Sequence, residues 1–238
     1  MKVYYVSDLH NDKRVGNILA FHPGDSDGVL VVAGDLNERG QSPQDLDEVA
    51  HRWRAIIFVP GNHDWFGLSL NDADKLLPKK SNVFLLNRTG VVIDDVEFVG
   101  CTLWSDANRH GTIWSCTSDA RMINGITAEQ ISARHWGDVK FINKIQSSPK
   151  LAYTRILVTH QAIHEASLDP RYDGDPSNPL YAINRPELLI GFDYHIHGHI
   201  HKVSDYGTEH GCRVLCNPSG YSRAEVPDFE LLKHIEVN

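Results

Sequence analysis

Aspartate, asparagine and histidine recur in five short motifs, and each motif follows a short run of apolar residues. The motifs are Ser7-Asp8-Leu9-His10, Gly34-Asp35-Leu36-Asn37, Gly61-Asn62-His63-Asp64, Val158-Thr159-His160 and Gly198-His199-Ile200-His201. Carboxylates and imidazoles together are usual ligands of divalent first-row metal ions. The residue types therefore indicate a metal site built from segments that lie far apart in the sequence.

Within two of the motifs the candidate ligands alternate with other residues. One residue separates Asp8 from His10, and one residue separates His199 from His201. Side chains two positions apart in an extended segment point to the same side. Both side chains of each pair can therefore point to the same side of the segment.

The motifs supply more donors than a single metal ion with an open coordination position would use. The candidate ligands are Asp8, His10, Asp35, Asn62, His160, His199 and His201. Two metal ions would use all of them if one carboxylate bridged the pair. Two metal ions roughly 3.5–4 Å apart are the usual arrangement for hydrolysing phosphate esters, so the donor count favours that chemistry.

Each motif also has an ordinary structural explanation when it is taken alone. A Gly-Asp pair after a strand is commonly a turn. The alternation of His195, His197, His199 and His201 would also suit the polar face of a strand. The stronger signal is the set of five motifs, each placed directly after an apolar run.

The elements that must position the motifs are predicted to be mostly short strands. Apolar, β-branched runs predict strands at residues 2–6, 28–33, 55–59, 83–86, 91–93, 96–104, 155–159, 194–196 and 213–216. Asp94-Asp95 predicts a tight hairpin turn between two of them. Ligands bind beyond the carboxyl ends of strands in open α/β sheets, so we expect the five motifs to converge there.

Capping patterns and apolar stripes predict two helices. Ser42-Pro43-Gln44-Asp45 places a capping serine before a proline at the first helical position. Thr127-Ala128-Glu129-Gln130 is a second capping box. The stripes that follow are Leu46, Val49, Ala50 and Trp53 for the first helix, and Ile131, His135, Val139, Ile142 and Ile145 for the second. A third helix is expected near residues 181–189, with Pro186 inside it.

The sequence contains no internal repeat, low-complexity tract or linker-like stretch, so we expect residues 1–238 to form a single domain. The early alternation of strands and helices predicts parallel strands with crossover helices. The hairpin in the middle predicts antiparallel strands. The expected fold class is mixed α/β, with one mixed sheet or two packed sheets flanked by helices.

Taken in order, the motifs resemble the signature of the calcineurin-like metallophosphoesterase superfamily, which reads Asp-x-His, Gly-Asp, Gly-Asn-His-Asp/Glu, His and Gly-His-x-His. The resemblance extends from Asp8 to Tyr221 and includes the closing turn Asn217-Pro218-Ser219-Gly220-Tyr221. Residues 118–122 and 171–176 look like a branch of small bacterial or phage phosphoesterases. The resemblance implies a four-layer αββα sandwich of two mixed sheets flanked by helices.

Carried over to this sequence, the resemblance implies two metal sites and two further functional residues. The first site would consist of Asp8, His10, Asp35 and His201. The second would consist of Asp35, Asn62, His160 and His199, with Asp35 bridging. The expected catalytic residues are His63, which would face the scissile phosphate, and Asp64, which would orient the His63 ring. Mixed oxygen and nitrogen ligation fits manganese, iron, zinc, nickel or magnesium, and we expect manganese.

The expected reaction is hydrolysis of a phosphate ester by a hydroxide that bridges the two metal ions. Metal binding lowers the pKa of water from 15.7 towards roughly 7, which makes such a hydroxide abundant at neutral pH. His63 would bind a phosphoryl oxygen or protonate the leaving group. A phosphodiester or nucleotide-type small substrate is slightly preferred. The alternatives are a phosphomonoesterase or a serine/threonine protein phosphatase, then a nuclease, then a non-catalytic scaffold on the same fold.

Several residues outside the motifs are weaker candidates. Arg39 resembles a phosphate-binding arginine of the protein-phosphatase branch, but Asn37 and Glu38 depart from that branch, which favours a solvated surface arginine. His164 is a candidate for the pocket wall, and His195 and His197 are candidates for contacts behind the metal ligands. We expect residues 105–124 and 166–180 to form the pocket rim. Of Trp104 and Trp114, at least one is expected in the core.

Composition limits the choice of partners. The 238 residues include 14 histidines and carry a net charge of −8. An extended nucleic-acid track needs clustered positive charge, so the expected partner is a small phosphorylated substrate. The sequence lacks a signal-peptide pattern and an apolar run long enough to cross a membrane. We therefore expect a soluble cytoplasmic protein without a membrane partner, and the oligomeric state stays open.

Overall fold

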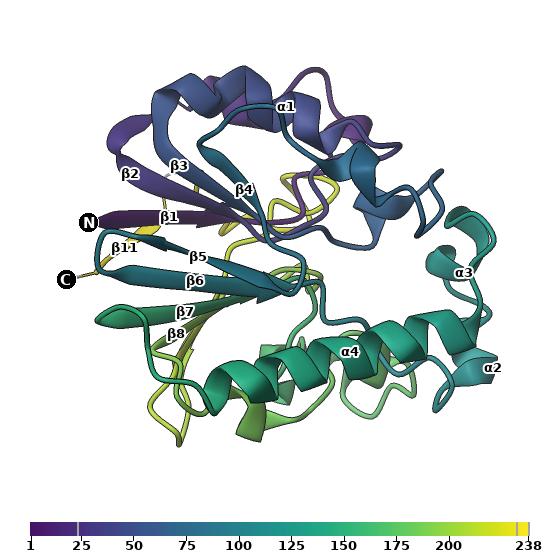
Figure 1. The fold of residues 1–238 in the computed structure, drawn as a ribbon. Coiled ribbons are helices and arrows are strands. Elements are labelled where there is room, and N and C mark those ends of the chain that lie inside the picture. The colour runs from purple at the N-terminus through teal and green to yellow at the C-terminus, as the bar shows by residue number, and fades with distance from the viewer. Residues whose placement is uncertain (23, 232, 238) are drawn as a thin grey trace.

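The computed structural model describes residues 1–22, 24–231 and 233–237. Two β-sheets lie face to face, and helices cover the outer face of each sheet (Figure 1). α1 (Ser42–Val49) packs against the first sheet and α4 (Ala128–Gln146) against the second. The layers therefore follow the order α, β, β and α, as the sequence predicts.

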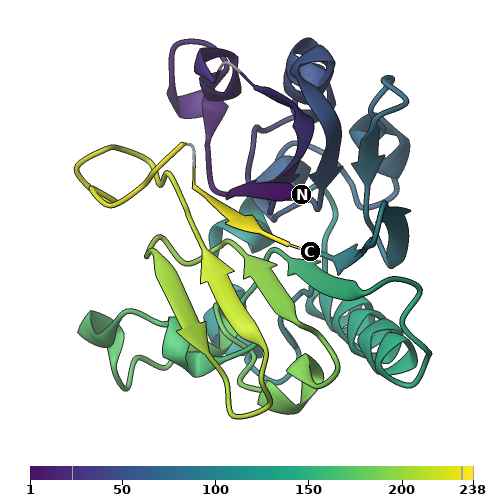
Figure 2. The same cartoon turned by 90° about the vertical axis from the view of Figure 1, so that its left-hand side faces the viewer.

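The first sheet contains the strands that precede the first three motifs. Its strand order is β11 (His234–Glu236), β1 (Lys2–Val6), β2 (Asp25–Val32), β3 (Trp53–Phe58) and β4 (Val83–Leu85). β1 to β4 are parallel, whereas β11 pairs antiparallel with β1. The two ends of the described chain consequently lie side by side, where the Met1 amino group donates to the Val237 carbonyl (Figure 2).

The second sheet contains the strands that precede the last two motifs. Its strand order is β5 (Thr89–Ile93), β6 (Val96–Cys101), β7 (Thr154–Thr159), β8 (Tyr194–His197), β10 (Arg213–Cys216) and β9 (Ser204–Gly207). The four central strands are parallel, and the two edge strands are antiparallel to their neighbours. The hairpin at Asp94-Asp95 is confirmed, with Asp94 at a φ of 52° where glycine is preferred.

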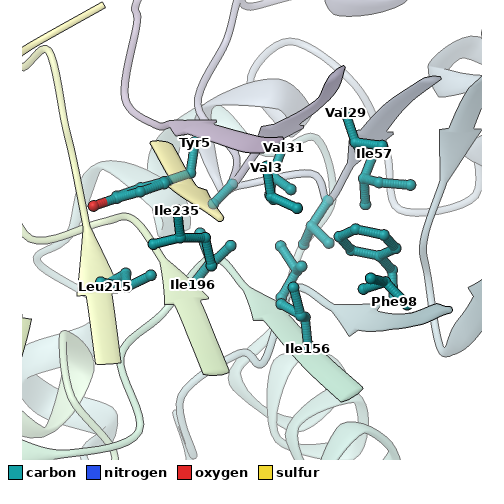
Figure 3. Packing of buried hydrophobic residues seen from close by; sticks show 14 of the residues in the cluster. Val3, Tyr5, Val29, Val31, Ile57, Phe98, Ile156, Ile196, Leu215 and Ile235 are labelled. Atoms are coloured by element: carbon teal, nitrogen blue, oxygen red, sulfur yellow. The ribbon is translucent and has the colours of Figure 1, made fainter. Parts of the chain in front are cut away.

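The alternation of side chains along the strands builds a core on both faces of each sheet. Along β1, Val3 and Tyr5 point into the space between the sheets, and they belong to the same buried cluster as Phe98 of the second sheet (Figure 3). Tyr4 and Val6 of the same strand face the opposite side and pack under α1. Because both faces of these parallel strands are buried, their sequences read as continuous apolar runs.

The remaining helices are short. α2 (Gly111–Trp114) and α3 (Ser118–Met122) lie in the segment between β6 and α4. In the described chain, 3-10 helices occur at Asn11–Lys13, Ile18–Phe21, Ala50–Arg52, His63–Trp65, Ala73–Leu76, Glu165–Ser167, Pro170–Tyr172, Asn178–Leu180 and Pro186–Leu189. The capping box at Thr127 is confirmed, with both reciprocal hydrogen bonds present.

Two helix predictions need correction. The helix expected near residues 181–189 is absent from this described segment, which instead has 3-10 helices at Asn178–Leu180 and Pro186–Leu189. Pro186 starts the second of these, in keeping with its missing amide hydrogen. Ser42 does not cap α1, because Gln41 occupies the cap position and the Ser42 hydroxyl donates to Asn37 and Asp64 instead.

Candidate metal centre

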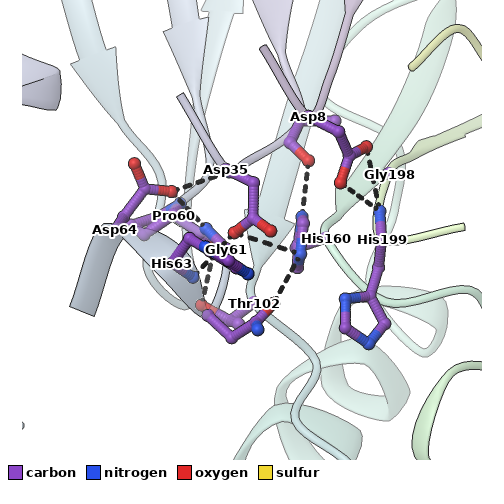
Figure 4. Close-up of polar contacts among 12 residues, drawn as sticks. Asp8, Asp35, Pro60, Gly61, His63, Asp64, Thr102, His160, Gly198 and His199 are labelled. Carbon is purple, nitrogen blue, oxygen red and sulfur yellow. Dashed lines mark hydrogen bonds and ion pairs between the residues drawn. The ribbon is translucent and has the colours of Figure 1, made fainter. Parts of the chain in front are cut away.

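The five motifs meet at the edge of the sandwich where the parallel strands end (Figure 4). Asp8 follows β1, Asp35 follows β2, His160 follows β7 and His199 follows β8. Backbone hydrogen bonds tie neighbouring turns together within each sheet, such as the bond from Asp8 N to Gly34 O (2.9 Å) in the first and the bond from Gly198 N to His160 O (2.9 Å) in the second. The bond from Ser7 N to Asn217 O (3.2 Å) joins the two sheets. The expected convergence is therefore present in the structure.

Several candidate ligands adopt a backbone conformation that is rare outside glycine. The φ angles of Asp8, His10, Asp35 and His199 are 51°, 44°, 55° and 65°. Such a left-handed conformation costs about 1–3 kcal/mol for a residue with a side chain and is often found at functional sites. These strained turns direct the four side chains towards one another.

Glycine at position 61 is required by the close packing of the site. A Cβ atom there would lie 2.1 Å from Asp35 Oδ1 and 2.6 Å from His160 Cε1. Any side chain would therefore displace two of the candidate ligands. This contact gives a physical reason for the glycine in the third motif.

The first group of donors consists of Asp8, His10 and His201, whose ligating atoms lie within 4.8 Å of one another. The two imidazole Nε2 atoms are 3.3 Å apart, and His201 Nε2 is 3.5 Å from Asp8 Oδ1. On its other side the His201 ring donates from Nδ1 to Glu225 Oε1 at 2.7 Å. Because Nδ1 carries that hydrogen, Nε2 of a neutral His201 presents its lone pair to the group.

The second group consists of Asp35, His160 and His199, also within 4.8 Å. His160 Nε2 lies 3.0 Å from Asn62 Oδ1 and 3.4 Å from Asp35 Oδ1. The His160 Nδ1 atom is 2.9 Å from the Ala33 carbonyl oxygen, so Nδ1 is the donor. Asp35 also belongs to a third group with His10 and His63, and it therefore connects the two halves of the site.

The acceptors of the second group fit a cation. Asn62 donates from Nδ2 to Asp119 Oδ1 at 2.8 Å, which leaves Asn62 Oδ1 facing His160. When His160 is neutral, the facing atoms of His160, Asn62 and Asp35 are all acceptors without a hydrogen between them. A divalent ion bound among them would satisfy all three, so the residues of this site fit the metal that their types predict.

In the metal-free protein a proton takes the place of such a cation. Burial opposes charging of His160, but the Asp35 carboxylate outweighs it and raises the pKa of His160 to about 10. Burial likewise opposes charging of His201, and Asp8 and Glu225 raise its pKa to about 9. By contrast, burial lowers the pKa of His10 to about 4 and that of His199 to about 3. Two rings thus hold protons that a metal ion must displace.

His63 lies beside the donor groups and contacts three side chains. Its Nδ1 atom is 3.3 Å from Glu38 Oε1, and its Nε2 atom is 3.3 Å from the Tyr221 hydroxyl. The ring packs on Phe66, with centroids 4.1 Å apart. The backbone N–H of His63 donates to Asp35 Oδ1 at 2.8 Å. The ring therefore stands next to the bridging candidate, with one nitrogen at Glu38 and the other towards the opening of the site.

The role expected for Asp64 needs correction. Asp64 is buried, and its hydrogen-bond donors are the backbone N–H groups of Asp35 (2.8 Å), Leu36 (3.3 Å), Asn37 (3.4 Å) and Gly61 (2.7 Å), together with the Ser42 hydroxyl. The acid at the His63 ring is Glu38 instead. Asp64 thus holds the turns after β2 and β3 against each other, and it acts on the site through the backbone.

Comparison with known families identifies the chain. The family profile described as calcineurin-like phosphoesterase matches residues 1–203. The chain belongs to this family. It is accordingly a phosphoesterase, a hydrolase of phosphate esters, and the family implies divalent metal ions at the donor groups described above.

Two proteins of Acanthamoeba polyphaga mimivirus, both described as uncharacterized, are related to this phosphoesterase in sequence. The first is 24% identical over 278 residues, which cover 98% of this chain and 96% of the viral protein. The second is 24% identical over 230 residues, which cover 84% of this chain and 14% of a much longer protein. The sequence match thus covers nearly the whole of the first viral protein and a small part of the second.

Two solved structures share the fold. The phosphopantetheinyl hydrolase PptH of Mycobacterium tuberculosis superimposes with a TM-score of 0.79 at 18% identity, over 100% of this chain and 96% of that one. A putative 5′-nucleotidase from Staphylococcus aureus, solved with alpha-ketoglutarate, gives a TM-score of 0.50 at 14% identity, over 93% of this chain and 49% of that one. At these identities the likeness establishes the fold.

Three residues that contact the donor groups were not predicted as site residues. Glu38 reaches the His63 ring, Glu225 reaches His201 and Asp119 reaches Asn62. Glu38 directly follows the second motif, three residues after Asp35, so its place in the sequence was a signal. Asp119 lies in the short helix α3 and Glu225 in a loop, both far from any ligand motif in sequence, where spacing gives no indication of contact.

The remaining candidates have mostly structural positions. His195 and His197 are buried behind the ligands, with rings stacked at 5.2 Å, and they bond to Thr159 and Ser167. His164 accepts from the Ala166 amide at the start of a 3-10 helix. Trp104 and Trp114 are both buried in one apolar cluster, and Arg39 is exposed. Among the described residues, none of the helices is long and apolar enough to cross a membrane.

Proposed function

We propose that this phosphoesterase hydrolyses phosphate esters with two divalent metal ions bound at the ends of its strands. The observation that carries the proposal is a pair of donor groups connected through Asp35. Within each group the ligating atoms lie within 4.8 Å of one another. One group alone would suit a single ion. Two groups connected by a buried carboxylate, which belongs to the second group and lies beside His10 of the first, suit the two-ion arrangement of phosphate-ester hydrolysis.

The seven donors divide between the two ions according to the measured contacts. Asp8, His10 and His201 would bind the first ion, while Asn62, His160 and His199 would bind the second. Asp35 would bridge, since it approaches both groups. Bound there, two divalent ions supply a nucleophilic water at neutral pH and neutralise charge on the phosphoryl oxygens. Manganese is our preferred ion, and iron, zinc, nickel and magnesium suit the same donors.

The residues around the donors supply the rest of the chemistry. His63 would hold or release a proton at Nε2, which lies 3.3 Å from the Tyr221 hydroxyl. Its Nδ1 atom lies 3.3 Å from Glu38 Oε1, a contact that orients the ring for protonation of a leaving oxygen. Tyr221 places its ring 4.4 Å from that of His10 and Tyr181 stacks on His199 at 4.9 Å, so two half-exposed aromatic rings flank the donor groups.

A small phosphodiester or nucleotide-type molecule is our preferred substrate. The names of the two similar structures refer to enzymes of phosphopantetheinyl groups and of nucleotides. Two aromatic rings at the opening also suit an organic group attached to the phosphate. The alternative is a phosphomonoesterase or a protein phosphatase, because exposed Arg39 lies next to Glu38 and could bind a terminal phosphate.

The test is a panel of metals against paired substrates. The purified protein is stripped with a chelator and reloaded with manganese, iron, zinc, nickel or magnesium. Each form is assayed on bis-p-nitrophenyl phosphate, p-nitrophenyl phosphate and cyclic nucleotides. We expect metal-dependent hydrolysis with the diesters turned over faster than the monoester. Activity that survives complete metal removal would contradict the proposal, and a large monoester preference would favour the alternative.

A further inference from the structure

A hydrogen bond from the pocket rim ends on one of the proposed metal ligands. Asp119 lies in α3, inside the segment of residues 105–124 that we expected to line the pocket. Its Oδ1 atom accepts a hydrogen from Asn62 Nδ2 at 2.8 Å. Asn62 belongs to the third motif and lies 57 residues before Asp119 in the sequence. The rim is thereby connected to the metal centre through a single amide.

The chemistry of an asparagine ligand explains why this contact matters. The two ends of the amide have nearly the same shape, but only the oxygen can bind a cation, while the NH2 group is a donor. A rotation that exchanges the two ends would place hydrogens beside His160 Nε2, where the lone pair is needed. An asparagine ligand therefore needs a partner that recognises its NH2 group.

Asp119 has the properties of such a partner. An ionised carboxylate can only accept hydrogen bonds, so it can pair with the NH2 end and not with the oxygen. With Nδ2 held by Asp119, the amide oxygen lies 3.0 Å from His160 Nε2, among the atoms of the second donor group. The contact thus selects the orientation that a cation requires.

The position of Asp119 is itself fixed by the backbone around the site. Thr117 caps α3 by accepting from the Ala120 amide. Gly67 N donates to Met122 O and Asn124 N donates to Leu68 O, both at 2.8 Å. Gly67 and Leu68 follow the third motif closely in sequence. The helix that presents Asp119 is therefore docked onto the segment that presents Asn62.

We propose that Asp119 is a positioning residue for the second metal ion, which it serves by holding the Asn62 amide with its oxygen towards the donor group. The proposal rests on the proposed function, because it takes Asn62 as a ligand. Loss of a partner behind a metal ligand typically lowers metal affinity about 10–100-fold. We expect that loss at the second ion only, since the first donor group contains no atom that contacts Asp119.

The first measurement uses the metal-free protein and needs no bound ion. In 15N-resolved NMR spectra the Asn62 side-chain NH2 signals should show one strongly hydrogen-bonded proton that exchanges slowly. In Asp119→Ala that proton should move to the position of a solvated amide. In Asp173→Ala, which removes an exposed carboxylate from the other rim segment, the Asn62 signals should not move. Unchanged Asn62 signals in Asp119→Ala would overturn the proposal.

The second measurement is calorimetric titration with Mn²⁺. Wild-type protein and Asp173→Ala should bind two ions, and Asp119→Ala should bind one of the two ions about 10–100-fold less tightly. Asp119→Asn places both an acceptor oxygen and an NH2 donor at this position, so it no longer selects the orientation of Asn62 and should lose affinity for the same ion. Wild-type affinity for both ions in Asp119→Ala would overturn the proposal. Circular dichroism checks that each variant is folded.

The two measurements separate this inference from the proposed function. Wild-type protein that binds one ion or none would contradict the two-metal proposal, whatever the behaviour of Asn62. Wild-type protein that binds two ions, together with Asp119→Ala that binds them equally well, would contradict only the role of Asp119.

Discussion

The floor and the rim of the site are built differently. We call the turns that follow β1, β2, β3, β7 and β8 the floor, and the two segments expected to line the pocket, residues 105–124 and 166–180, the rim. In the floor, buried carboxylates accept backbone hydrogens from other turns, as Asp64 does from Asp35 and Asp8 does from His199. In the rim, exposed acids accept hydrogen bonds from residues two positions away, as Asp175 does from Ser177. The floor is thus fixed by long-range contacts, whereas much of the rim is held locally.

This difference suggests a division of labour. A rigid floor suits reaction chemistry, because a displacement of about 1 Å at a catalytic group can cost roughly 100-fold in rate. A rim with local contacts can change in sequence without disturbing the floor, and it therefore suits the choice of substrate. Asp119 is an exception within the rim, since it contacts a floor residue. The following predictions test this division, beginning with the largest expected effect.

Removing the bridging carboxylate should cause the greatest loss. Asp35→Ala removes the one side chain that approaches both donor groups, so both ions should lose affinity and activity should fall below detection. Metal analysis after gel filtration and a diester assay would measure the two effects. An Asp35→Ala protein that retained two tightly bound ions would show that Asp35 does not bridge.

Removing His63 should separate chemistry from metal binding. The ring lies beside the floor but is not among the seven expected ligands, so His63→Ala should keep both ions. Its turnover should fall about 10²–10⁴-fold, the usual contribution of general acid–base catalysis. Turnover and metal content are measured on the same preparation. Loss of a metal ion from this variant would place His63 among the ligands.

Metal affinity should depend steeply on pH. The pKa of His160 is about 10 in the metal-free protein, because Asp35 outweighs the effect of burial. At neutral pH the ring is therefore protonated, and a metal ion must displace that proton. Affinity at the second site should rise about tenfold per pH unit up to that pKa. Calorimetry in buffers of different ionisation enthalpy would detect the released protons, and equal heats in all buffers would contradict the prediction.

Neutralising Glu38 should have a smaller effect than removing His63. Glu38→Gln weakens the partner of His63 Nδ1, which lies 3.3 Å away, and turnover should fall about tenfold. Turnover of the two proteins loaded with the same metal ion measures the effect, and unchanged turnover in Glu38→Gln would contradict the prediction. Asp64→Asn is the informative comparison, because Asp64 bonds to backbone N–H groups and its loss should mainly lower the free energy of unfolding.

The smallest effect is expected at Tyr181, which directly follows the second rim segment. Tyr181 stacks on His199 at the opening and is 42% exposed. An aromatic contact of this kind is worth about 0.5–1.5 kcal/mol, so Tyr181→Ala should raise KM roughly two- to tenfold for substrates with a large organic group. The KM of a small monoester should change little. An equal change for both substrates would indicate damage to the floor.

The sequence allowed the floor to be predicted more completely than the rim. The ligand motifs end apolar strands whose parallel pairing brings their carboxyl ends together, so local pattern and topology agree. Asp64 was assigned to the wrong partner, because adjacency to His63 in sequence does not show that its carboxylate turns back to the amides of Asp35 and Gly61. The hydrogen-bond partners of Asp64 depend on how the turns after β2 and β3 pack against each other.

The short helices α2 and α3 and the edge strands β9 and β11 were missed for a physical reason. α2 and α3 contain four and five residues, too few to show an apolar period. β9 is only partly buried and β11 is short, so neither presents a clear apolar alternation. The contacts of Asp119 and Glu225 form only in the folded chain. Short elements whose stability comes from tertiary contacts leave little trace in the local sequence.

The central claim is that seven side chains hold two divalent ions with Asp35 between them. Native mass spectrometry of the manganese-loaded protein tests it directly, with His201→Ala and His160→Ala as matched single-ligand variants. The account predicts two ions per wild-type chain and one ion in each variant. A wild-type chain that bound a single ion, or variants that each retained two, would contradict it.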